Sequence, residues 1–391
     1  MSTTRTVSIF GATGSVGTST LDLVRSNRDA YRVSVLTAHR DVDQLAALAR
    51  EFSAELAVIA DESRLAELQN ALTGSGIEAA AGEAALVAAA DHDVDWTMAA
   101  IVGCAGLAPT MAALKRGNCV ALANKEALVS AGALMTDVAR ASGASLLPVD
   151  SEHNAIFQCL AGGKIEDVRT ITLTASGGPF RGRSRSELQS VTPEQAVAHP
   201  NWDMGAKISV DSATMMNKGL ELIEAYYLFP VGLDNIHILV HPQSVIHSMV
   251  EYHDRSTLAQ LGSPDMRIPI ASALAWPDRM HTDCTPLDLA TIGQLDFMAP
   301  DEKTFPATAM ARAAISAGGA RPAMLNAANE IAVAAFLAGK IGFLDIADIV
   351  DGVLQSLDCA APQNIEDVLE IDSLARQAAR EQAMLAPVSP G

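Results

Sequence analysis

Three acidic residues in two separate segments have the types and spacing of a divalent-cation site. Asp150 and Glu152 follow the apolar run 145–149 and are separated by one residue. Residues i and i+2 of an extended chain point the same way, so both carboxylates could converge on one cation. A third carboxylate, from Glu221, would complete a set of oxygen ligands suited to Mg²⁺ or Mn²⁺. The alternative for the first pair is a helix N-terminus, with Asp150 or Ser151 as its cap and Glu152 in its first turn.

The segment 209–224 is rich in polar residues and predicts a helix that begins near Asp211. Such a helix places Asn217, Lys218 and Glu221 on one face. Asn217 and Lys218 could then donate hydrogen bonds to a phosphate group near the cation. The alternative is an ion pair within the helix, between Lys218 and Glu221 at positions i and i+3.

A glycine-rich turn at residues 11–17 predicts a dinucleotide-binding loop. Its sequence, Gly-Ala-Thr-Gly-Ser-Val-Gly, follows the apolar run 7–10 and precedes a segment with helical periodicity. Glycines let backbone N–H groups approach a pyrophosphate closely, and the N-terminus of the following helix favours negative charge. The spacing G-x-x-G-x-x-G is a variant of the common dinucleotide pattern.

The residues after the second predicted strand indicate which dinucleotide binds. His39, Arg40 and Asp41 stand at this point, where an acidic residue would bind the ribose of NAD and a cation would bind the 2′-phosphate of NADP. The guanidinium of Arg40 suits a phosphate, so we predict NADPH. The alternative is a surface ion pair between Arg40 and Asp41.

Two loop segments add further polar groups. Residues 174–179 end a predicted strand in a Ser-Gly-Gly-Pro turn, which can offer N–H groups and a hydroxyl to an anion. Residues 199–205 combine a histidine, the large apolar Trp202 and a glycine. This second segment could close over a substrate and exclude water.

Asn124, Lys125 and Glu126 follow another predicted strand, 119–123. Lys125 could face the substrate from this edge of the sheet. The alternative is a helix start, with Asn124 as the cap and Glu126 in the first turn.

The cysteines and histidines favour neither a disulfide framework nor a zinc site. The five cysteines are odd in number and include no C-x-x-C pair, which is typical of thiols in a reducing cytosol. Cys104 is the one candidate nucleophile, and a small buried residue is the alternative. The histidines at 237, 241, 247 and 253 are interrupted by Pro242, and ordinary polar or core positions account for them.

The composition describes a globular, acidic protein. The 391 residues are 49% hydrophobic and 19% charged, enough for two or three domains. The net charge of −19 disfavours binding to nucleic acids or anionic membrane surfaces. The N-terminus has no signal-peptide pattern and no run of about 18 apolar residues occurs, so a cytoplasmic protein is expected.

Residues 1–150 alternate short apolar runs with helical segments, which predicts an α/β fold with a Rossmann-like, mostly parallel sheet. We interpret this part as the NADPH-binding domain. The expected strands are 7–10, 32–38, 56–60, 96–101, 119–123 and 145–149, and the expected helices include 44–52, 64–72 and 126–141.

The rest of the chain predicts an α+β catalytic domain and a C-terminal helical domain. Residues 151–276 would form the catalytic and metal-binding domain, with strands 170–175, 236–239 and 244–250 and a lid loop at 180–207. Residues 277–302, with three prolines, would be a linker. Residues 303–391 are rich in alanine and predict helices, among them 323–338 and 367–384.

Taken together, these segments resemble the 1-deoxy-D-xylulose 5-phosphate reductoisomerase family. The resemblance is carried by residues 11–17, 124–128, 149–154, 174–180, 199–205 and above all 207–225, and it continues through 241–250, 260–276 and 325–336. It implies rearrangement of the carbon skeleton of a phosphorylated ketose, followed by NADPH-dependent reduction to 2-C-methyl-D-erythritol 4-phosphate in the non-mevalonate route to isoprenoids. It also implies a divalent cation (Mn²⁺, Mg²⁺ or Co²⁺) and a homodimer.

The resemblance assigns roles residue by residue. The metal ligands of the family correspond to Asp150, Glu152 and Glu221. Its phosphate-binding positions correspond to Ser176, Ser212, Asn217 and Lys218, with His199 close by. Positions that contact the sugar correspond to Lys125, Ser151 and Glu152. Cofactor positions correspond to Thr13, Gly14, Ser15, Val16, Asn124, Glu126 and Gly205, whereas His39-Arg40-Asp41 replaces the family's usual Gly-basic-Asn stretch.

Two other functions share parts of this pattern. A semialdehyde dehydrogenase also begins with a similar glycine loop, but it needs a nucleophilic cysteine, for which Cys104 or Cys159 would have to serve. A non-enzymatic NADP-binding sensor could use the same sheet, but it has no need for three converging carboxylates.

Overall fold

The computed structural model describes residues 4–198 and 205–385. The contacts between residues divide the chain into two compact units. The first unit contains the chain up to Ala127, Ala133–Asn154 and Asp265–Cys284, and the second contains Leu128–Gly132, Ala155–Pro264 and the chain from Thr285 onward.

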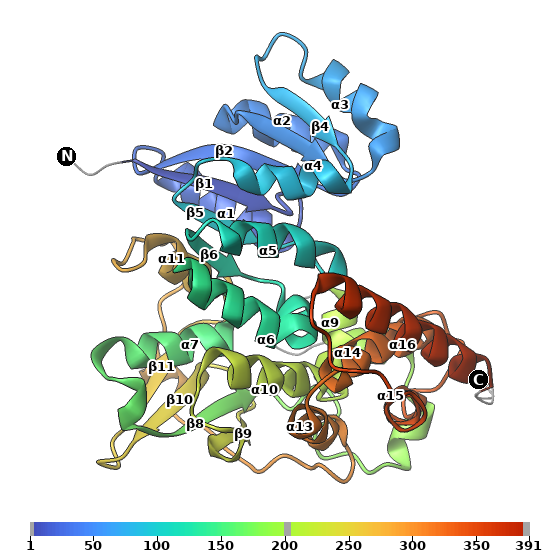
Figure 1. Ribbon diagram of the computed structural model, residues 1–391. Coiled ribbons are helices and arrows are strands. Elements are labelled where there is room, and N and C mark those ends of the chain that lie inside the picture. The colour runs from blue at the N-terminus through green and yellow to red at the C-terminus, as the bar shows by residue number, and fades with distance from the viewer. Residues whose placement is uncertain (1–3, 199–204, 386–391) are drawn as a thin grey trace. The chain divides into compact units, whose positions relative to one another are not determined.

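The first unit is built on a seven-stranded, fully parallel sheet in the order β4-β3-β2-β1-β5-β6-β7 (Figure 1). This confirms the Rossmann-like sheet and all six predicted strands. The strands are β1 (Arg5–Phe10), β2 (Tyr31–Ala38), β3 (Leu56–Ile59), β4 (Glu78–Ala81), β5 (Trp96–Ala99), β6 (Cys119–Leu122) and β7 (Ser145–Pro148).

The strand β4 was not predicted because its sequence is Glu-Ala-Ala-Ala. Alanine and glutamate favour helices in isolation. Here the segment is an edge strand whose residues pair in register with β3, from Leu56 with Glu78 to Ile59 with Ala81. Pairing with a buried neighbour therefore overrides the local preference.

Helices connect successive strands of this sheet, as a parallel arrangement requires. Each buries an apolar face; α1, for example, buries Leu21, Leu23 and Val24. The helix α6 is interrupted at Ala131, whose backbone angles are not helical. The helices are α1 (Ser15–Ser26), α2 (Val42–Phe52), α3 (Leu65–Ala71), α4 (Glu83–Ala88), α5 (Leu107–Lys115) and α6 (Lys125–Ser142).

A later segment returns to the first unit. The helix α11 (Arg267–Ala275) packs against α1. The guanidinium of Arg5 donates hydrogen bonds to the carbonyl oxygens of Leu274 and Trp276 at 2.6 and 3.0 Å, and Trp96 Nε1 donates to Ala273 O at 3.0 Å. These contacts join residues 273–276 to the N-terminal sheet. The same residues were predicted to belong to the catalytic domain at 151–276.

The second unit contains a four-stranded mixed sheet in the order β11-β10-β8-β9. β8 and β9 are parallel, and the other neighbours are antiparallel. Three strands match the prediction, and the edge strand β11 was missed. The strands are β8 (Val168–Ala175), β9 (Ile236–Val240), β10 (Ile246–Tyr252) and β11 (Thr257–Leu261).

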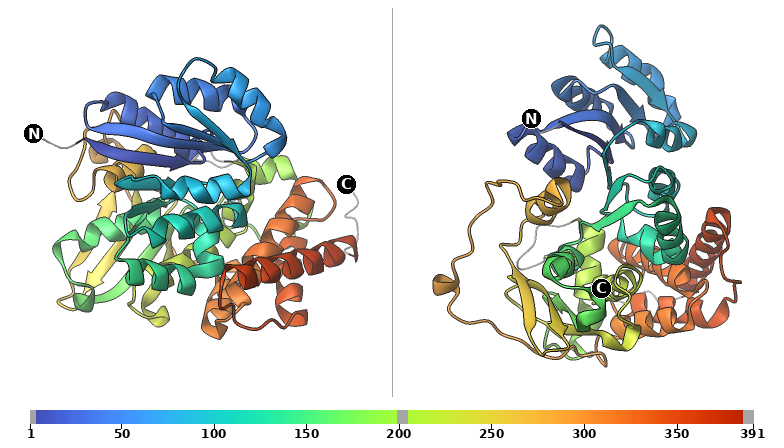
Figure 2. Two further views of the ribbon diagram at one scale, coloured as in Figure 1. Left: turned by 45° about the horizontal axis from the view of Figure 1, so that its top comes forward. Right: turned by 60° about the vertical axis from the view of Figure 1, so that its left-hand side comes forward.

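The C-terminal part is helical, as predicted. The long helix α14 packs against α13, α15 and α16, and both views of Figure 2 show these orange-to-red helices packed together. Most residues of α14 are buried, and they include two asparagines, Asn326 and Asn329. The helices are α13 (Ala307–Ala317), α14 (Arg321–Leu337), α15 (Asp345–Ser356) and α16 (Ile365–Leu385).

Four further helices lie between β7 and β9 along the chain. They are α7 (Ser151–Cys159), α8 (Pro193–Val197), α9 (Ala206–Ala213) and α10 (Met216–Leu228). The described part of the expected lid loop contains α8, which begins with a capping box formed by Thr192 and Gln195. Residues 199–204, including His199 and Trp202, lie outside the described residues.

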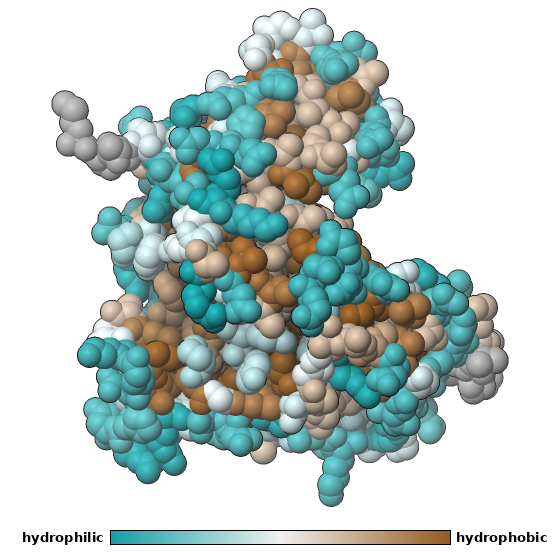
Figure 3. Space-filling view, in the orientation of Figure 1, coloured by the Kyte–Doolittle hydropathy of each residue, from teal (hydrophilic) through white to brown (hydrophobic). Residues whose placement is uncertain are grey.

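On the face drawn in Figure 3, hydrophilic residues lie mainly along the outline, and hydrophobic ones occupy broader areas toward the middle of the view. The large exposed hydrophobic residues are scattered along the sequence, from Val102 to Met384.

Among the described residues, no helix combines the length and the apolar character that crossing a membrane requires.

Candidate functional site

Asp150 stands at the junction of β7 and α7, and its carboxylate has several partners. Lys125 Nζ lies 2.6 Å from Asp150 Oδ2. Asp150 Oδ1 accepts a hydrogen bond from Glu152 N at 3.1 Å and lies 3.1 Å from Nδ1 of the fully buried His153. Asp150 therefore caps the helix that begins at Ser151.

Asp150 and Glu152 therefore do not lie on an extended chain, and that prediction was wrong. Glu152 lies in the first helical turn, as the alternative interpretation had it. Its carboxylate accepts a hydrogen bond from Ser151 Oγ at 3.0 Å. A capping role does not exclude metal binding, because the capping oxygen is only one of the two oxygens of Asp150.

The predicted helix from Asp211 is in fact two helices. α9 ends at Ala213, Met215 adopts a left-handed conformation with φ of 65°, and α10 begins at Met216. The Thr214 hydroxyl accepts a hydrogen bond from Met216 N at 3.3 Å. This local bond competes with the helical pattern and helps the chain to turn.

α10 places Asn217, Lys218 and Glu221 on one face, as predicted. Glu221 is fully buried. Its Oε1 accepts a hydrogen bond from Asn217 Nδ2, and its Oε2 forms an ion pair with Lys218 Nζ. The intrahelical pair considered above is therefore present, and it keeps a buried carboxylate accompanied by a cation.

One carboxylate oxygen from each of Asp150, Glu152 and Glu221 lies within 4.8 Å of the others. Two oxygens that bind one Mg²⁺ at 2.0–2.1 Å are at most about 4 Å apart. The three side chains are thus close to the spacing that a shared cation needs. Three carboxylates are also the hard oxygen donors that such a cation prefers, so the residues present fit a divalent ion.

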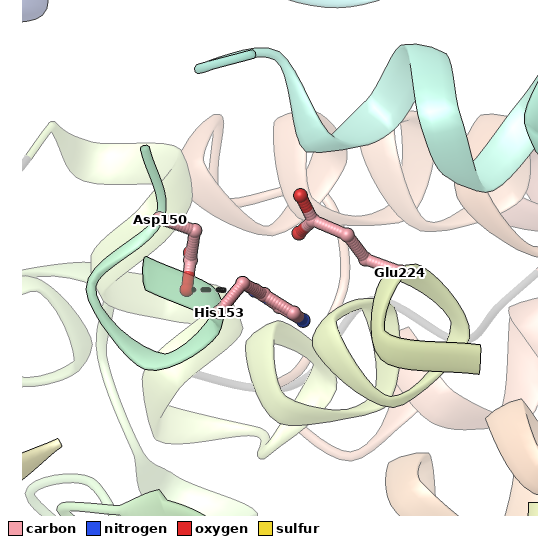
Figure 4. Close-up of side chains that lie close together, drawn as sticks. All are labelled: Asp150, His153 and Glu224. Atoms are coloured by element: carbon pink, nitrogen blue, oxygen red, sulfur yellow. Dashed lines mark hydrogen bonds and ion pairs between the residues drawn. The ribbon is translucent and has the colours of Figure 1, made fainter. Parts of the chain in front are cut away.

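A second group of potential ligand atoms, from Asp150, His153 and Glu224, also lies within 4.8 Å. Figure 4 shows Asp150 and His153 joined by their hydrogen bond, with the buried Glu224 of α10 close to them. His153 and Glu224 were not predicted as site residues from the sequence. Their spacing was the available signal, since each follows a predicted ligand by three residues, one turn along its helix.

The turn that contains Ser176 packs directly against the end of α9. Gly178 has φ of 68°, and a Cβ atom there would lie 2.7 Å from Ser212 O and 3.0 Å from the Cα atom of Ala213. Ser176 Oγ accepts a hydrogen bond from Gly178 N at 3.2 Å. The structure thus places the turn that contains Ser176 against the backbone of Ser212, and both serines were predicted to bind phosphate.

Replacing Gly178 with alanine is expected to destabilise the protein more than the same change at Gly182. Both glycines have positive φ, but no atom lies within 4 Å of a Cβ built at Gly182. Gly182→Ala should therefore cost only the backbone strain, about 1–2 kcal/mol, whereas Gly178→Ala adds a backbone clash. Thermal unfolding of the two variants measures the difference, and equal melting temperatures would contradict this close packing.

The glycine-rich loop lies at the point where the order of the first sheet reverses, between β1 and β5. This is where open α/β sheets bind ligands. Gly17 must be glycine, because a Cβ there would lie 2.2 Å from Gly11 O. Gly14 and Ser15 are exposed at the start of α1, and Thr13 and Val16 beside them are half-buried.

Arg40 and Asp41 do not pair with each other. Arg40 Nε lies 2.8 Å from Asp61 Oδ2, and the Arg40 side chain is 67% exposed. Asp41 instead caps α2 by accepting a hydrogen bond from Gln44 N at 3.0 Å. The guanidinium is thus held at the carboxyl end of β2 with most of its surface accessible to a ligand, and His39 beside it is also exposed.

Asn124 caps α6, as the alternative interpretation had it. Its Oδ1 accepts a hydrogen bond from Ala127 N at 3.0 Å, and its Nδ2 donates to Gly103 O at 2.8 Å. Asn124 therefore ties the loop after β5 to the start of α6. Glu126 is buried in the first turn of this helix. Gly205 is the N-cap residue of α9.

Burial disfavours the thiolate form of four of the described cysteines. Burial raises the pKa of the Cys119 and Cys159 thiols to about 11 each and also raises the pKa of Cys284 and Cys359.

Both ring nitrogens of His241 face backbone groups, with Nδ1 at 2.9 Å from Asp296 O and Nε2 accepting from Val245 N at 3.3 Å.

Three family models match successive parts of the chain. Residues 7–132 match 1-deoxy-D-xylulose 5-phosphate reductoisomerase, residues 146–229 match the 1-deoxy-D-xylulose 5-phosphate reductoisomerase C-terminal domain, and residues 261–378 match the DXP reductoisomerase C-terminal domain.

Curated relatives and solved structures agree with these models. The 1-deoxy-D-xylulose 5-phosphate reductoisomerase of Zymomonas mobilis is 62% identical over 96% of this chain and 97% of its own, and that of Afipia carboxidovorans is 55% identical over 96% and 93%. A structure of the Zymomonas mobilis enzyme in complex with NADPH has a TM-score of 0.93 at 59% identity, covering 97% of this chain and 99% of that one.

A DOX-P reductoisomerase structure in complex with NADPH, fosmidomycin and magnesium has a TM-score of 0.92 at 44% identity, covering 97% of this chain and 98% of that one. Identity at this level over nearly the whole chain, together with three matching family models, leaves one assignment. The chain belongs to the 1-deoxy-D-xylulose 5-phosphate reductoisomerase family.

Proposed function

We propose that this chain converts 1-deoxy-D-xylulose 5-phosphate to 2-C-methyl-D-erythritol 4-phosphate in the non-mevalonate route to isoprenoids. The carbon skeleton rearranges to an aldehyde, and NADPH reduces that aldehyde. Among the observations on this chain, the proposal depends most on the three carboxylate oxygens of Asp150, Glu152 and Glu221, which lie within 4.8 Å of one another. Membership of the family supplies the identity of the substrate.

Asp150, Glu152 and Glu221 would hold the divalent cation, with Mn²⁺, Mg²⁺ and Co²⁺ as candidates. When bound, such a cation polarises a carbonyl group and orients a neighbouring hydroxyl. Lys125 forms an ion pair with Asp150, and Lys218 forms one with Glu221. Lys125 would also contact the sugar, as would Ser151 and Glu152.

Ser176, Ser212, Asn217 and Lys218 would bind the phosphate of the substrate, with His199 and Trp202 closing over it. Support comes from the packing of the Ser176 turn against Ser212 and from the position of Asn217 and Lys218 on one face of α10. Binding energy from a remote phosphate can be used to orient the reacting end of the molecule.

NADPH would bind across the glycine-rich loop and the carboxyl ends of β2 and β6. Two similar structures are complexes with NADPH. Exposed backbone at the start of α1 suits the pyrophosphate, and Arg40 suits the 2′-phosphate. The remaining candidate contacts are Thr13, Gly14, Ser15, Val16, His39, Asp41, Asn124, Glu126 and Gly205.

Replacing Arg40 with alanine is expected to weaken NADPH binding by about 10-fold or more, since a hydrogen bond to a charged group contributes about 1.5–3 kcal/mol. NADH, which lacks the 2′-phosphate, should be affected much less. Michaelis constants for both dinucleotides measure this. Arg32→Ala is the matched control, because Arg32 lies at the opposite end of β2 and pairs with Glu55. Equal losses for NADPH and NADH would remove Arg40 from 2′-phosphate recognition.

We also propose that the protein is cytoplasmic and acts as a homodimer. The acidic composition and the lack of a disulfide bond among the described residues support a cytoplasmic location. Sedimentation analysis of the purified protein tests the dimer.

A single assay tests the main proposal. Purified protein is incubated with 1-deoxy-D-xylulose 5-phosphate and NADPH, with and without Mn²⁺, and NADPH oxidation is followed by absorbance. Metal-dependent oxidation with formation of 2-C-methyl-D-erythritol 4-phosphate is expected. Absence of any metal-stimulated oxidation would instead favour a non-enzymatic NADP-binding sensor.

The dehydrogenase alternative is tested by thiol alkylation. A semialdehyde dehydrogenase needs a thiolate nucleophile, whereas burial keeps the Cys159 thiol protonated at neutral pH by raising its pKa to about 11. We expect turnover to survive alkylation of the accessible cysteines and to be lost on addition of a chelator. Inactivation by alkylation that substrate prevents would favour the dehydrogenase.

A further inference from the structure

The helix α9 contains a carboxylate, that of Asp211, that is buried and held from two directions. The side chain of Asp211 is 1% exposed. Its Oδ2 lies 2.9 Å from Nζ of Lys207, one turn earlier on the same helix. Its Oδ1 accepts a hydrogen bond from Asn329 Nδ2 at 2.8 Å. Asn329 belongs to α14, more than a hundred residues further along the chain.

The bond from Asn329 joins two buried polar side chains. Asn329 is fully buried, and the neighbouring residues of α14 are mostly apolar. Burying an amide and a carboxylate is unfavourable unless each finds a partner. Among the described residues, the amide oxygen of Asn329 has no hydrogen-bond partner. The side chain therefore sits in the core with its donor directed at Asp211, where an apolar residue would leave Asp211 Oδ1 without this bond.

Asp211 is adjacent to the residues that line the candidate phosphate site. Ser212 follows it directly, and Ser212 O would touch a Cβ at Gly178, in the turn that contains Ser176. Thr214 Oγ1 donates to Asp211 O at 3.2 Å, just before the left-handed residue Met215. The Asp211 side chain is thus tied to α14 one residue before Ser212, in the last turn of α9.

We propose that the Asn329–Asp211 hydrogen bond positions Ser212 for binding of the substrate phosphate. Asn329, on α14, would thus determine the affinity of the protein for the phosphate group. Asn329 and Asp211 are positioning residues and do not contact the substrate. The inference rests on the proposed function, because it takes Ser212 as a phosphate ligand. It adds that the geometry of this ligand is set from α14.

The first test compares Asn329→Ala with Asn326→Ala. Both variants delete a fully buried amide of α14, but Asn326 donates to Glu330 and not to Asp211. The probe is inorganic phosphate, assayed as a competitive inhibitor against 1-deoxy-D-xylulose 5-phosphate. We expect Asn329→Ala to raise the inhibition constant for phosphate and the KM for substrate by about 10-fold each, the loss of a hydrogen bond to a charged group. The Kd for NADPH should change less than about twofold, which shows that the variant is folded.

Asn326→Ala should leave phosphate inhibition within about twofold of the unmodified protein, because it removes no bond to α9. Equal effects of the two alanine variants on phosphate inhibition would overturn the proposal, since any defect would then come from α14 as a whole. A fall in kcat with unchanged phosphate inhibition would overturn it as well.

An exchange of the two side chains gives a second test that does not delete the amide. Asn329→Asp alone places two carboxylates against each other and should weaken phosphate inhibition strongly. Combining it with Asp211→Asn restores one carboxylate and one amide and should recover most of the phosphate affinity. A double variant no better than Asn329→Asp alone would refute the pairing. If the unmodified protein turns over its substrate but these variants do not change phosphate inhibition as expected, the positioning role is wrong and the proposed function stands.

Discussion

Glu221→Gln is expected to lower kcat by about 10³-fold or more, because a metal-bound carboxylate contributes several kcal/mol of transition-state stabilisation through the cation it holds. The change keeps the shape of the side chain and removes its charge. Glu221 is fully buried, so glutamine also leaves Lys218 without its anionic partner. NADPH affinity should change little, and equilibrium binding of NADPH beside steady-state kinetics separates the two effects.

Glu330→Gln is the matched control for this prediction. Glu330 is a partly buried carboxylate of the second unit that pairs with Arg376 at 2.6 Å and accepts a hydrogen bond from Asn326. Losing this ion pair should affect stability modestly and should leave turnover near that of the unmodified protein. A Glu221→Gln variant with normal kcat would exclude Glu221 from the metal site, and a variant that had lost NADPH binding would point to general disruption.

The second large effect is expected for Asp150→Asn. Asparagine can still accept the hydrogen bond from Glu152 N, so the cap of α7 is retained. The negative charge between Lys125 and His153 is lost, which weakens cation binding. We expect turnover at saturating metal to fall by about 10²–10³-fold and half-activation to require at least about 10-fold more Mn²⁺.

Melting temperature decides between a metal role and a purely structural one for Asp150. The asparagine variant should unfold within a few degrees of the unmodified protein when both are free of metal, because the cap survives. A large loss of stability with an unchanged metal requirement would assign Asp150 to capping alone.

Much of the first unit could be predicted because its strands are continuous apolar runs and its helices are amphipathic. The features that escaped prediction depend on partners distant in sequence. β4 is a strand because β3 lies beside it, although Glu-Ala-Ala-Ala favours a helix. α11 belongs to the first unit because Arg5 and Trp96 bond to its last carbonyl groups.

The candidate site was predicted in its residue types better than in its geometry. Asp150 and Glu152 were expected on an extended chain, but they stand at a helix start, where the cap and the ligand can be the same side chain. The break between α9 and α10 could not be read from the sequence, since methionine rarely adopts the left-handed conformation seen at Met215. Asp211 and Asn329 meet only in the folded chain.

The return of residues 265–284 to the first unit has a consequence for synthesis of the protein. The carbonyl groups that Arg5 and Trp96 contact belong to residues 273–276, so a nascent chain that has reached only residue 150 lacks the helix that covers α1. The N-terminal sheet must therefore wait for more than a hundred further residues to leave the ribosome before its packing is complete. A fragment that ends at residue 150 should accordingly be poorly soluble, with the apolar surface of α1 exposed.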